Sequence, residues 1–222
     1  IMAYTTINKS SDYFTPNLHT GTGSARNITG IGFQPDFTIV KRRESSGVWY
    51  NTDIVRGAGK QMYLNETGGM GSSASTTEIT GFNSDGFNLG TDGGVNASSG
   101  TYVSYNFLAN NTTGSSNTNG AITSTVSANT TSGFSIVKWN GTGSTSTIGH
   151  GLSTAPSMII TKSLGGSSAW GVYNESMGNT KIVFLNESGS SGTNAAYWNN
   201  TSPTSSVFTV GSDAAVNHSG NA

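Results

Sequence analysis

Two carboxylates recur in matching turn-like contexts, and they are the first residues to consider for catalysis. Glu66 stands in LNETGG and Glu187 in LNESGS, while Asp92 and Asp213 lie in GTDGGVN and GSDAAVN. A glycosidase needs two carboxylates about 5–10 Å apart across one cleft, and the same acid repeated in two loops gives no such pair. Asp side chains in turns bond their own backbone. We therefore expect structural carboxylates and no catalytic residue, so the protein is not expected to be an enzyme.

Metal and cofactor chemistry also has weak support. The histidines are His19, His150 and His218. None has a ligand-spaced partner of the H-E-x-x-H kind, and the chain has no cysteine for a thiolate site. A calcium site in NSDGFNLGTDGG, using Asn83, Asp85 and Asp92, lacks the regular alternation of oxygen ligands that dedicated loops have. We expect no metal and no cofactor, with calcium left as an alternative.

Binding has better candidates than catalysis. A basic row, Lys41-Arg42-Arg43, lies between an apolar stretch and Trp49, and the segment NAAYWNNTSPTS places two aromatic residues in a polar context. A loop aromatic can stack on a sugar face while Asn and Thr complete the hydrogen bonds. The candidate ligand-binding residues are Trp139, Tyr197, Trp198, Arg42 and Arg43. The alternative is that the rings cover an exposed edge of the core and that the arginines decorate the solvated tip of a hairpin.

Composition limits the fold that must position these residues. Hydrophobic residues make up 33% and charged residues 9%, with a formal net charge of −1, against about 45–50% and about 25% in typical domains. The nine Phe, eight Tyr and four Trp supply core material. The sequence has no helical apolar stripe and no apolar run long enough to span a membrane. We therefore expect an ordered β protein. Its near-neutral charge argues against nucleic acid as a partner.

The chain contains an internal repeat. GFQPDFTIVKRRESSGVW aligns with GLSTAPSMIITKSLGGSSAW, which places Trp49 on Trp170 at an offset of 121 residues. The same offset aligns GAGKQMYLNETG with GNTKIVFLNESG, and GFNLGTDGGVN with VFTVGSDAAVN. A constant offset through Trp, Lys and Leu-Asn-Glu indicates a duplication. Residues shared by both copies, such as Trp49 and Trp170, are expected to hold the fold, whereas the five candidate binding residues are each found in one copy only.

Short strands separated by turn clusters, about ten residues apart, predict β-sandwich or jelly-roll-like domains. We expect an all-β protein with two tandem β-sandwich domains from an internal duplication. The predicted ranges are an N-terminal arm at 1–7, a first repeat at 8–109, a Ser/Thr/Asn-rich linker at 110–127 and a second repeat at 128–222. The strands expected in the first repeat lie near 13–19, 26–31, 36–43, 47–54, 60–65, 76–82, 86–90 and 101–108.

The second repeat lacks a counterpart of TYVSYNF, the last strand of the first repeat. If that strand is central, its absence leaves an apolar slot and an open edge. In one interpretation the chain is simply cut short. In the other, a strand from a neighbouring subunit fills the slot, for example MAYTTI near the N-terminus, and such head-to-tail contacts build rings or filaments.

These motifs together resemble a family of virion proteins of tailed bacteriophages, especially marine phages. The resemblance rests on MAYTTINKSSDYF, GFQPDFTIVK, VRGAGKQMYLN, FNSDGFNLG and VNASSGTYVSYNF. It implies a β-rich tail-fibre or other exterior structural protein, located on the extracellular particle and without catalytic residues to carry over. We also expect self-association and contact with other virion proteins.

We therefore expect a non-enzymatic virion structural protein, exposed on the tail fibre or capsid surface, that can bind host cell-surface carbohydrate. Two alternatives remain. One is a subunit of an extracellular filament or surface layer assembled by strand exchange, and the other is a carbohydrate-active enzyme, a depolymerase. Neither a nucleic-acid partner nor a membrane span is expected.

Overall fold

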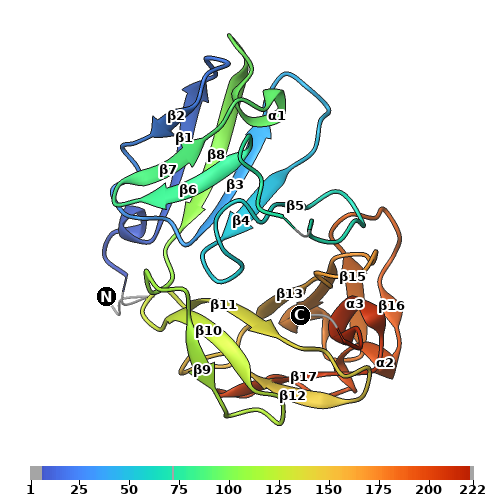
Figure 1. Ribbon diagram of the computed structural model, residues 1–222. Coiled ribbons are helices and arrows are strands. Elements are labelled where there is room, and N and C mark those ends of the chain that lie inside the picture. Colours follow the sequence, from blue (N-terminus) through green and yellow to red (C-terminus); the bar gives the residue numbers. More distant parts are fainter. Residues whose placement is uncertain (1–6, 72, 221–222) are drawn as a thin grey trace. The chain divides into compact units, whose positions relative to one another are not determined.

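The computed structural model describes residues 7–71 and 73–220, and strands dominate it (Figure 1). The predicted all-β class is confirmed. The predicted N-terminal arm and the MAYTTI segment fall almost entirely outside the described residues. Among the described helices, none has the length and apolar character needed to cross a membrane.

The chain divides into two compact units. Unit 1 consists of Ile1–Gln61, Gly71–Gly114 and Ser127–Ile136, and unit 2 of Met62–Met70, Ser115–Val126 and Val137–Ala222. The ranges differ from the predicted domains in two places: residues 62–70, predicted in the first repeat, belong to unit 2, and residues 128–136, predicted in the second repeat, belong to unit 1. The segment 110–127, expected as a linker, contributes strand β9 (Ser115–Asn117) and the start of β10 (Ser124–Asn129).

Unit 1 is built from two antiparallel sheets. Its strands and helical turns are η1 (Ser10–Asp12), β1 (Phe14–Thr20), β2 (Arg26–Ile28), β3 (Phe37–Arg42), β4 (Tyr50–Asp53), β6 (Ile79–Asn83), β7 (Gly86–Leu89), α1 (Gly93–Asn96) and β8 (Thr101–Phe107). Four strands lie in the order β1-β8-β3-β4, and three in the order β2-β7-β6. Val40 and Tyr102 from the first sheet share one buried cluster with Ile28, Ile79 and Phe87 from the second, which makes the unit a β-sandwich.

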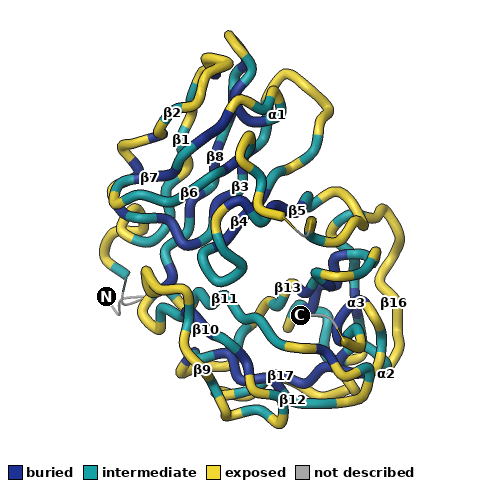
Figure 2. The backbone as a smooth tube through the Cα atoms, in the orientation of Figure 1, coloured by how far each residue is buried: buried dark blue, intermediate teal, exposed yellow. Residues whose placement is uncertain are grey.

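Unit 2 has shorter sheets around its own core. Its elements are β5 (Met62–Tyr63), β12 (Ser146–Gly149), β13 (Met158–Thr161), β14 (Gly171–Asn174), η2 (Glu175–Met177), β15 (Lys181–Phe184), β16 (Gly192–Thr193), α2 (Ala195–Trp198), β17 (Val207–Val210) and α3 (Ala214–Asn217). Two further strands, β10 and β11 (Phe134–Trp139), each have residues in both units. The sheet orders are β13-β14-β15-β16, β12-β17 and β11-β10-β9. Figure 2 shows the buried run along β17, whose Phe208 and Val210 contribute to the core with Ile148 and Trp198.

Burial alternates along strand β8, and its buried face is largely polar. Tyr102, Ser104 and Asn106 are completely buried, while Thr101, Val103, Tyr105 and Phe107 are half-buried. The polar groups are satisfied locally, because Thr38 Oγ1 donates to Asn106 Oδ1 at 3.1 Å and Asn106 Nδ2 donates to Ser104 Oγ at 2.9 Å. A buried polar group is tolerated when it is hydrogen-bonded in this way.

The repeat in the sequence coincides with a repeated local structure. Asp92 caps α1 by accepting a hydrogen bond from Gly94 N, and Asp213 caps α3 by accepting one from Ala215 N. Asn96 accepts from Thr22 N and donates to Ser24 O and Gly90 O. Asn217 accepts from Thr142 N and donates to Ser144 O and Gly211 O. The recurring aspartates are therefore structural, and the duplication itself stays an inference from the sequence.

Candidate functional site

The five predicted binding residues lie in two separate places. Arg42 ends β3 and Arg43 follows it in unit 1, whereas Trp139, at the end of β11, and Tyr197 and Trp198, on α2, belong to unit 2. Arg43 is exposed, and the Arg42 side chain is 34% exposed. The arginines thus remain available to a ligand.

The prediction that Trp198 binds a ligand is wrong, because Trp198 is a core residue and not a loop residue. Its side chain is 1% exposed and packs edge-on against Tyr173, with ring centroids 5.8 Å apart. The polar context had indicated a loop, but Asn194 Oδ1 accepts a hydrogen bond from Ala196 N and caps the single turn of α2. That turn directs Trp198 inward, so it cannot stack on a sugar.

Tyr197 and Trp139 pack on the edge of the same core. Tyr197 meets Phe184 edge-on at 5.9 Å, and Trp139 meets Phe208 edge-on at 5.7 Å. Both are half-buried members of the shell around the core of unit 2. This agrees with the alternative in which these rings cover a core edge.

A more open aromatic surface lies in unit 1. Phe14 of β1 and Tyr105 of β8 are stacked with ring centroids 6.5 Å apart and planes 7° from parallel. Trp49, just before β4, stacks with Tyr105 at 6.5 Å and 14°. Phe14 and Tyr105 are half-buried and Trp49 is 36% exposed. We call these three residues the aromatic platform. Trp49 is the most exposed of the three, and an exposed aromatic face is a surface on which the apolar C–H face of a sugar ring can pack.

Lys41 adds a cation to the platform and also closes the hairpin between β3 and β4. Its Nζ lies 6.0 Å from the centre of the Trp49 ring, within the range of a cation–π contact. The same ammonium group donates to Arg42 O at 2.6 Å and Ser45 O at 2.5 Å. Lys162 repeats the arrangement in unit 2, donating to Ser163 O and Gly166 O. The shared lysine therefore holds the hairpin turn in both units.

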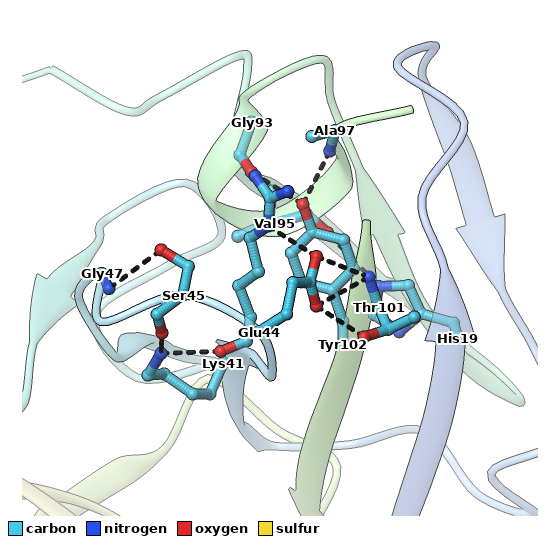
Figure 3. Close-up of polar contacts among 11 residues, drawn as sticks. His19, Lys41, Glu44, Ser45, Gly47, Gly93, Val95, Ala97, Thr101 and Tyr102 are labelled. Carbon is cyan, nitrogen blue, oxygen red and sulfur yellow. Dashed lines mark hydrogen bonds and ion pairs between the residues drawn. The ribbon is translucent and has the colours of Figure 1, made fainter. Parts of the chain in front are cut away.

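A carboxylate unique to unit 1 fixes the tip of this hairpin. Figure 3 shows Glu44 reaching the first residue of β8, where its carboxylate accepts hydrogen bonds from Thr101 N at 3.1 Å and Thr101 Oγ1 at 2.5 Å. Arg42 Nε donates to the same carboxylate at 2.8 Å. The bonds from Thr101, followed by that from Arg42, lower the pKa of Glu44 to about 2. In the second copy this position is Gly165, so the restraint is absent there.

A pocket of about 230 Å³ lies at the same hairpin. It is lined by Arg42, Ser45, Gly47, Val48, Tyr50, Gly93 and Gly94. Tyr50 Oη donates to Asp92 Oδ1 at 3.2 Å. A Cβ on Gly94 would come within 2.0 Å of Tyr50 Oη, so only glycine leaves room for the tyrosine. In the second copy, Gly171 aligns with Tyr50 and Ala215 aligns with Gly94. The tyrosine wall of the pocket is therefore specific to unit 1.

Three of the residues that line the pocket carry polar side chains that can form hydrogen bonds. A guanidinium, a serine hydroxyl and a tyrosine hydroxyl line it, and these groups suit a ligand rich in hydroxyl or carboxylate oxygens. Across residues 7–71 and 73–220, no three His, Cys, Asp or Glu side chains gather as a metal site would require. Asp85, named in the calcium alternative, instead accepts hydrogen bonds from Gly30 N and Gly32 N.

Trp49 is the residue that sequence reasoning missed. The match with Trp170 indicated a role in the fold for both. Trp170 is 7% exposed, and its Nε1 donates to Tyr63 O and Glu66 O of the segment Met62–Met70. Trp49 keeps an exposed face instead. The available signal was the alternation in TYVSYNF, which places Tyr105 and Phe107 on one face of the strand and so indicates an aromatic face there.

Comparison with known proteins gives a family without a function. A family model described as Domain of unknown function (DUF7483) matches residues 9–222. A search of the curated proteins and a search of the solved structures each found no match. Arguments about function therefore depend on the residues and their geometry.

Proposed function

Since the chain belongs to the DUF7483 family, whose description names no activity, we propose a function from its residues. The protein is a non-enzymatic structural component of a bacteriophage virion, exposed on the tail fibre or capsid surface, and its unit 1 binds carbohydrate of the host cell surface. The likeness of MAYTTINKSSDYF, GFQPDFTIVK and VNASSGTYVSYNF to exterior virion proteins supports the location. Its partners are further copies of the chain, other virion proteins and the host glycan.

The aromatic platform is the observation that carries the glycan-binding part. Carbohydrate sites pair a flat apolar surface with a few directional polar groups, because a sugar ring has an apolar C–H face and hydroxyl edges. Phe14, Tyr105 and Trp49 supply the surface. Arg42 and Ser45 of the neighbouring pocket supply donors on the same hairpin, and Glu44 holds that hairpin to β8.

Two measurements test the proposal. Antibodies against the chain, used with electron microscopy of purified phage particles, should label the tail or capsid. The isolated chain should bind surface polysaccharide purified from the host and leave the polymer length unchanged. Unlabelled particles would contradict the virion assignment. A shortened polymer would favour the depolymerase, and failure to bind any host polysaccharide would contradict the glycan-binding role.

A second candidate is a subunit of an extracellular filament or surface layer built by strand exchange. One observation favours it: β13 is the edge of its sheet and exposes Met158 and Ile160. An apolar edge strand is a template for pairing with another chain. Filaments formed by the purified chain would support this candidate.

A further inference from the structure

A segment of the first repeat lies on a hairpin of the second. We call this segment, Met62–Met70, the strap. It belongs to unit 2, and the hairpin consists of residues 162–170. Trp170 Nε1 donates to Tyr63 O at 3.0 Å and to Glu66 O at 3.2 Å. The strap thus satisfies the indole N–H, and Trp170 is 7% exposed.

Three further hydrogen bonds join the same hairpin to backbone atoms of the strap. Thr67 O accepts from Lys162 Nζ at 3.0 Å and from Ser168 N at 2.9 Å. Met70 N donates to Leu164 O at 2.6 Å. Because the strap contributes carbonyl and amide groups, another segment of the same backbone shape can form the same bonds.

The matching hairpin of unit 1, residues 41–49, has the same lysine and a more exposed tryptophan. Trp49 is 36% exposed, against 7% for Trp170. Lys41 and Lys162 each donate to two carbonyls of their own hairpin, and Lys162 makes its third bond to the strap. An ammonium group has three N–H donors. Across residues 7–71 and 73–220, Lys41 has hydrogen bonds to its two hairpin carbonyls alone, so one donor is left for a further acceptor.

A second segment of the chain has the sequence and the turn of the strap. Residues 183–191 align with residues 62–70 at the offset of 121, and Leu-Asn-Glu recurs in both. Glu66 N donates to Tyr63 O in the strap, and Glu187 N donates to Phe184 O in the matching turn. Leu185 is 48% exposed and residues 187–191 are all exposed, so this segment is open to a partner.

The charges of this segment and of the unit 1 hairpin are complementary. The hairpin carries three cations, Lys41, Arg42 and Arg43, against one carboxylate, Glu44. Residues 183–191 carry a carboxylate, Glu187, and no cation. Opposite charges on two surfaces steer their encounter and disfavour wrong partners.

We propose that the hairpin 41–49 of one chain is the docking site for residues 183–191 of a second copy, in the geometry that the strap has on residues 162–170. The two surfaces lie on different units, so the contact is head-to-tail and builds a ring or an open filament. The inference rests on the self-association in the proposed function, for which it supplies a surface, and does not depend on glycan binding.

The alignment gives the bonds of the docked state. Trp49 Nε1 donates to Phe184 O and Glu187 O, as Trp170 Nε1 donates to the strap. Lys41 Nζ donates to Ser188 O with the proton that its own hairpin leaves unused. Docking covers Trp49, so a second copy and a glycan compete for that side chain.

One residue of the second segment fits less closely than its counterpart in the strap. A Cβ on Gly69 would come within 2.7 Å of Leu164 O, and the residue aligned with Gly69 is Ser190. The docked segment therefore lies slightly farther from its hairpin than the strap does. Ser190→Gly removes this Cβ and should lower the dissociation constant about fivefold or more, as relief of overpacking does.

Light scattering of the 222-residue chain without glycan, over a range of concentrations, tests the proposal. The mean mass should rise above that of one chain as the concentration rises, and added salt should reduce it. Ser46 aligns with Ser167, whose hydroxyl donates to Thr67 Oγ1 at 3.2 Å. Ser46→Glu in the hairpin and Ser190→Trp in the second segment should each keep the chain monomeric.

A mixture of the two variants tests the head-to-tail arrangement. One variant keeps an intact segment and the other an intact hairpin, so an equimolar mixture should form pairs and no longer assemblies. The matched controls, Ser98→Glu and Ser205→Trp, change exposed serines elsewhere and should assemble like the unchanged chain.

The proposal would be overturned by an unchanged chain that stays monomeric at every concentration, by association of either blocked variant alone, or by a Ser190→Gly chain that associates no more tightly. These outcomes are separate from glycan binding, because Ser46 and Ser190 belong neither to the aromatic platform nor to the residues that line the pocket. A monomeric chain that binds host polysaccharide would contradict the docking alone, and an assembling chain that binds none would contradict the glycan-binding role alone.

Discussion

At the scale of single residues, the difference between the two copies separates structural from ligand-facing side chains. Lys41 and Lys162 make the same two bonds to hairpin carbonyls, so the shared lysine is structural. Arg42 and Glu44 are found in unit 1 only, and they shape the hairpin tip beside the platform. Trp49 is an exception to this division between shared structural residues and unique ligand-facing ones. It aligns with Trp170, but Trp49 keeps an exposed face whereas Trp170 is buried.

Glu44 gives a pH prediction. Its folded pKa of about 2 lies below the ordinary value of 4.5. A lowered carboxyl pKa means that the bonds to Thr101 and Arg42 favour folding above pH about 4.5, and that this contribution is lost as the pH falls toward 2. Carboxyl NMR titration should place the Glu44 midpoint near 2, and Arg42→Ser should move it upward. A midpoint near 4.5 in the unmodified chain would show that the hairpin tip is not held in solution.

At the scale of elements, the strands of the first repeat were largely predictable. All eight predicted strand positions contain an observed strand, because turn clusters of Gly, Ser and Asn separate short runs rich in β-branched and aromatic residues. The buried face of β8 was not predictable from hydrophobicity, since Ser104 and Asn106 are buried through bonds to each other and to Thr38. Trp198 was missed because a one-turn helix capped by Asn194 has no periodic signal.

The repeated asparagine gives a prediction at this scale. Asn96 and Asn217 each join one backbone amide and two carbonyls from three segments of their unit. Replacing either by Ala leaves these buried groups without partners, at a cost of about 3 kcal/mol. Urea denaturation should show similar losses for Asn96→Ala and Asn217→Ala. Asn140→Ala, at an exposed position, is the control, with a change within about 0.5 kcal/mol. Losses as small as the control would contradict the shared motif.

At the scale of the whole molecule, the two units share a plan but differ in their surfaces. Unit 1 completes its sheet with β8 and presents the aromatic platform and the pocket. Unit 2 buries its tryptophans 170 and 198 and leaves β13 open. The sequence repeat predicts the common plan. The assignment of residues 62–70 to unit 2 was not predictable, because it depends on the contacts that this segment makes with Trp170.

The central claim is that unit 1 binds host glycan on its aromatic platform, and residue-resolved NMR of the bound chain tests it most directly. The four tryptophans give separable indole signals. Oligosaccharide from the host surface should shift the signal of Trp49 and leave those of Trp170 and Trp198 in place. Trp49→Ala should weaken binding about tenfold or more, as loss of a central aromatic contact does, while Leu185→Ala, at another exposed apolar side chain, should not. Shifts confined to the tryptophans of unit 2, or unchanged binding by Trp49→Ala, would contradict the account.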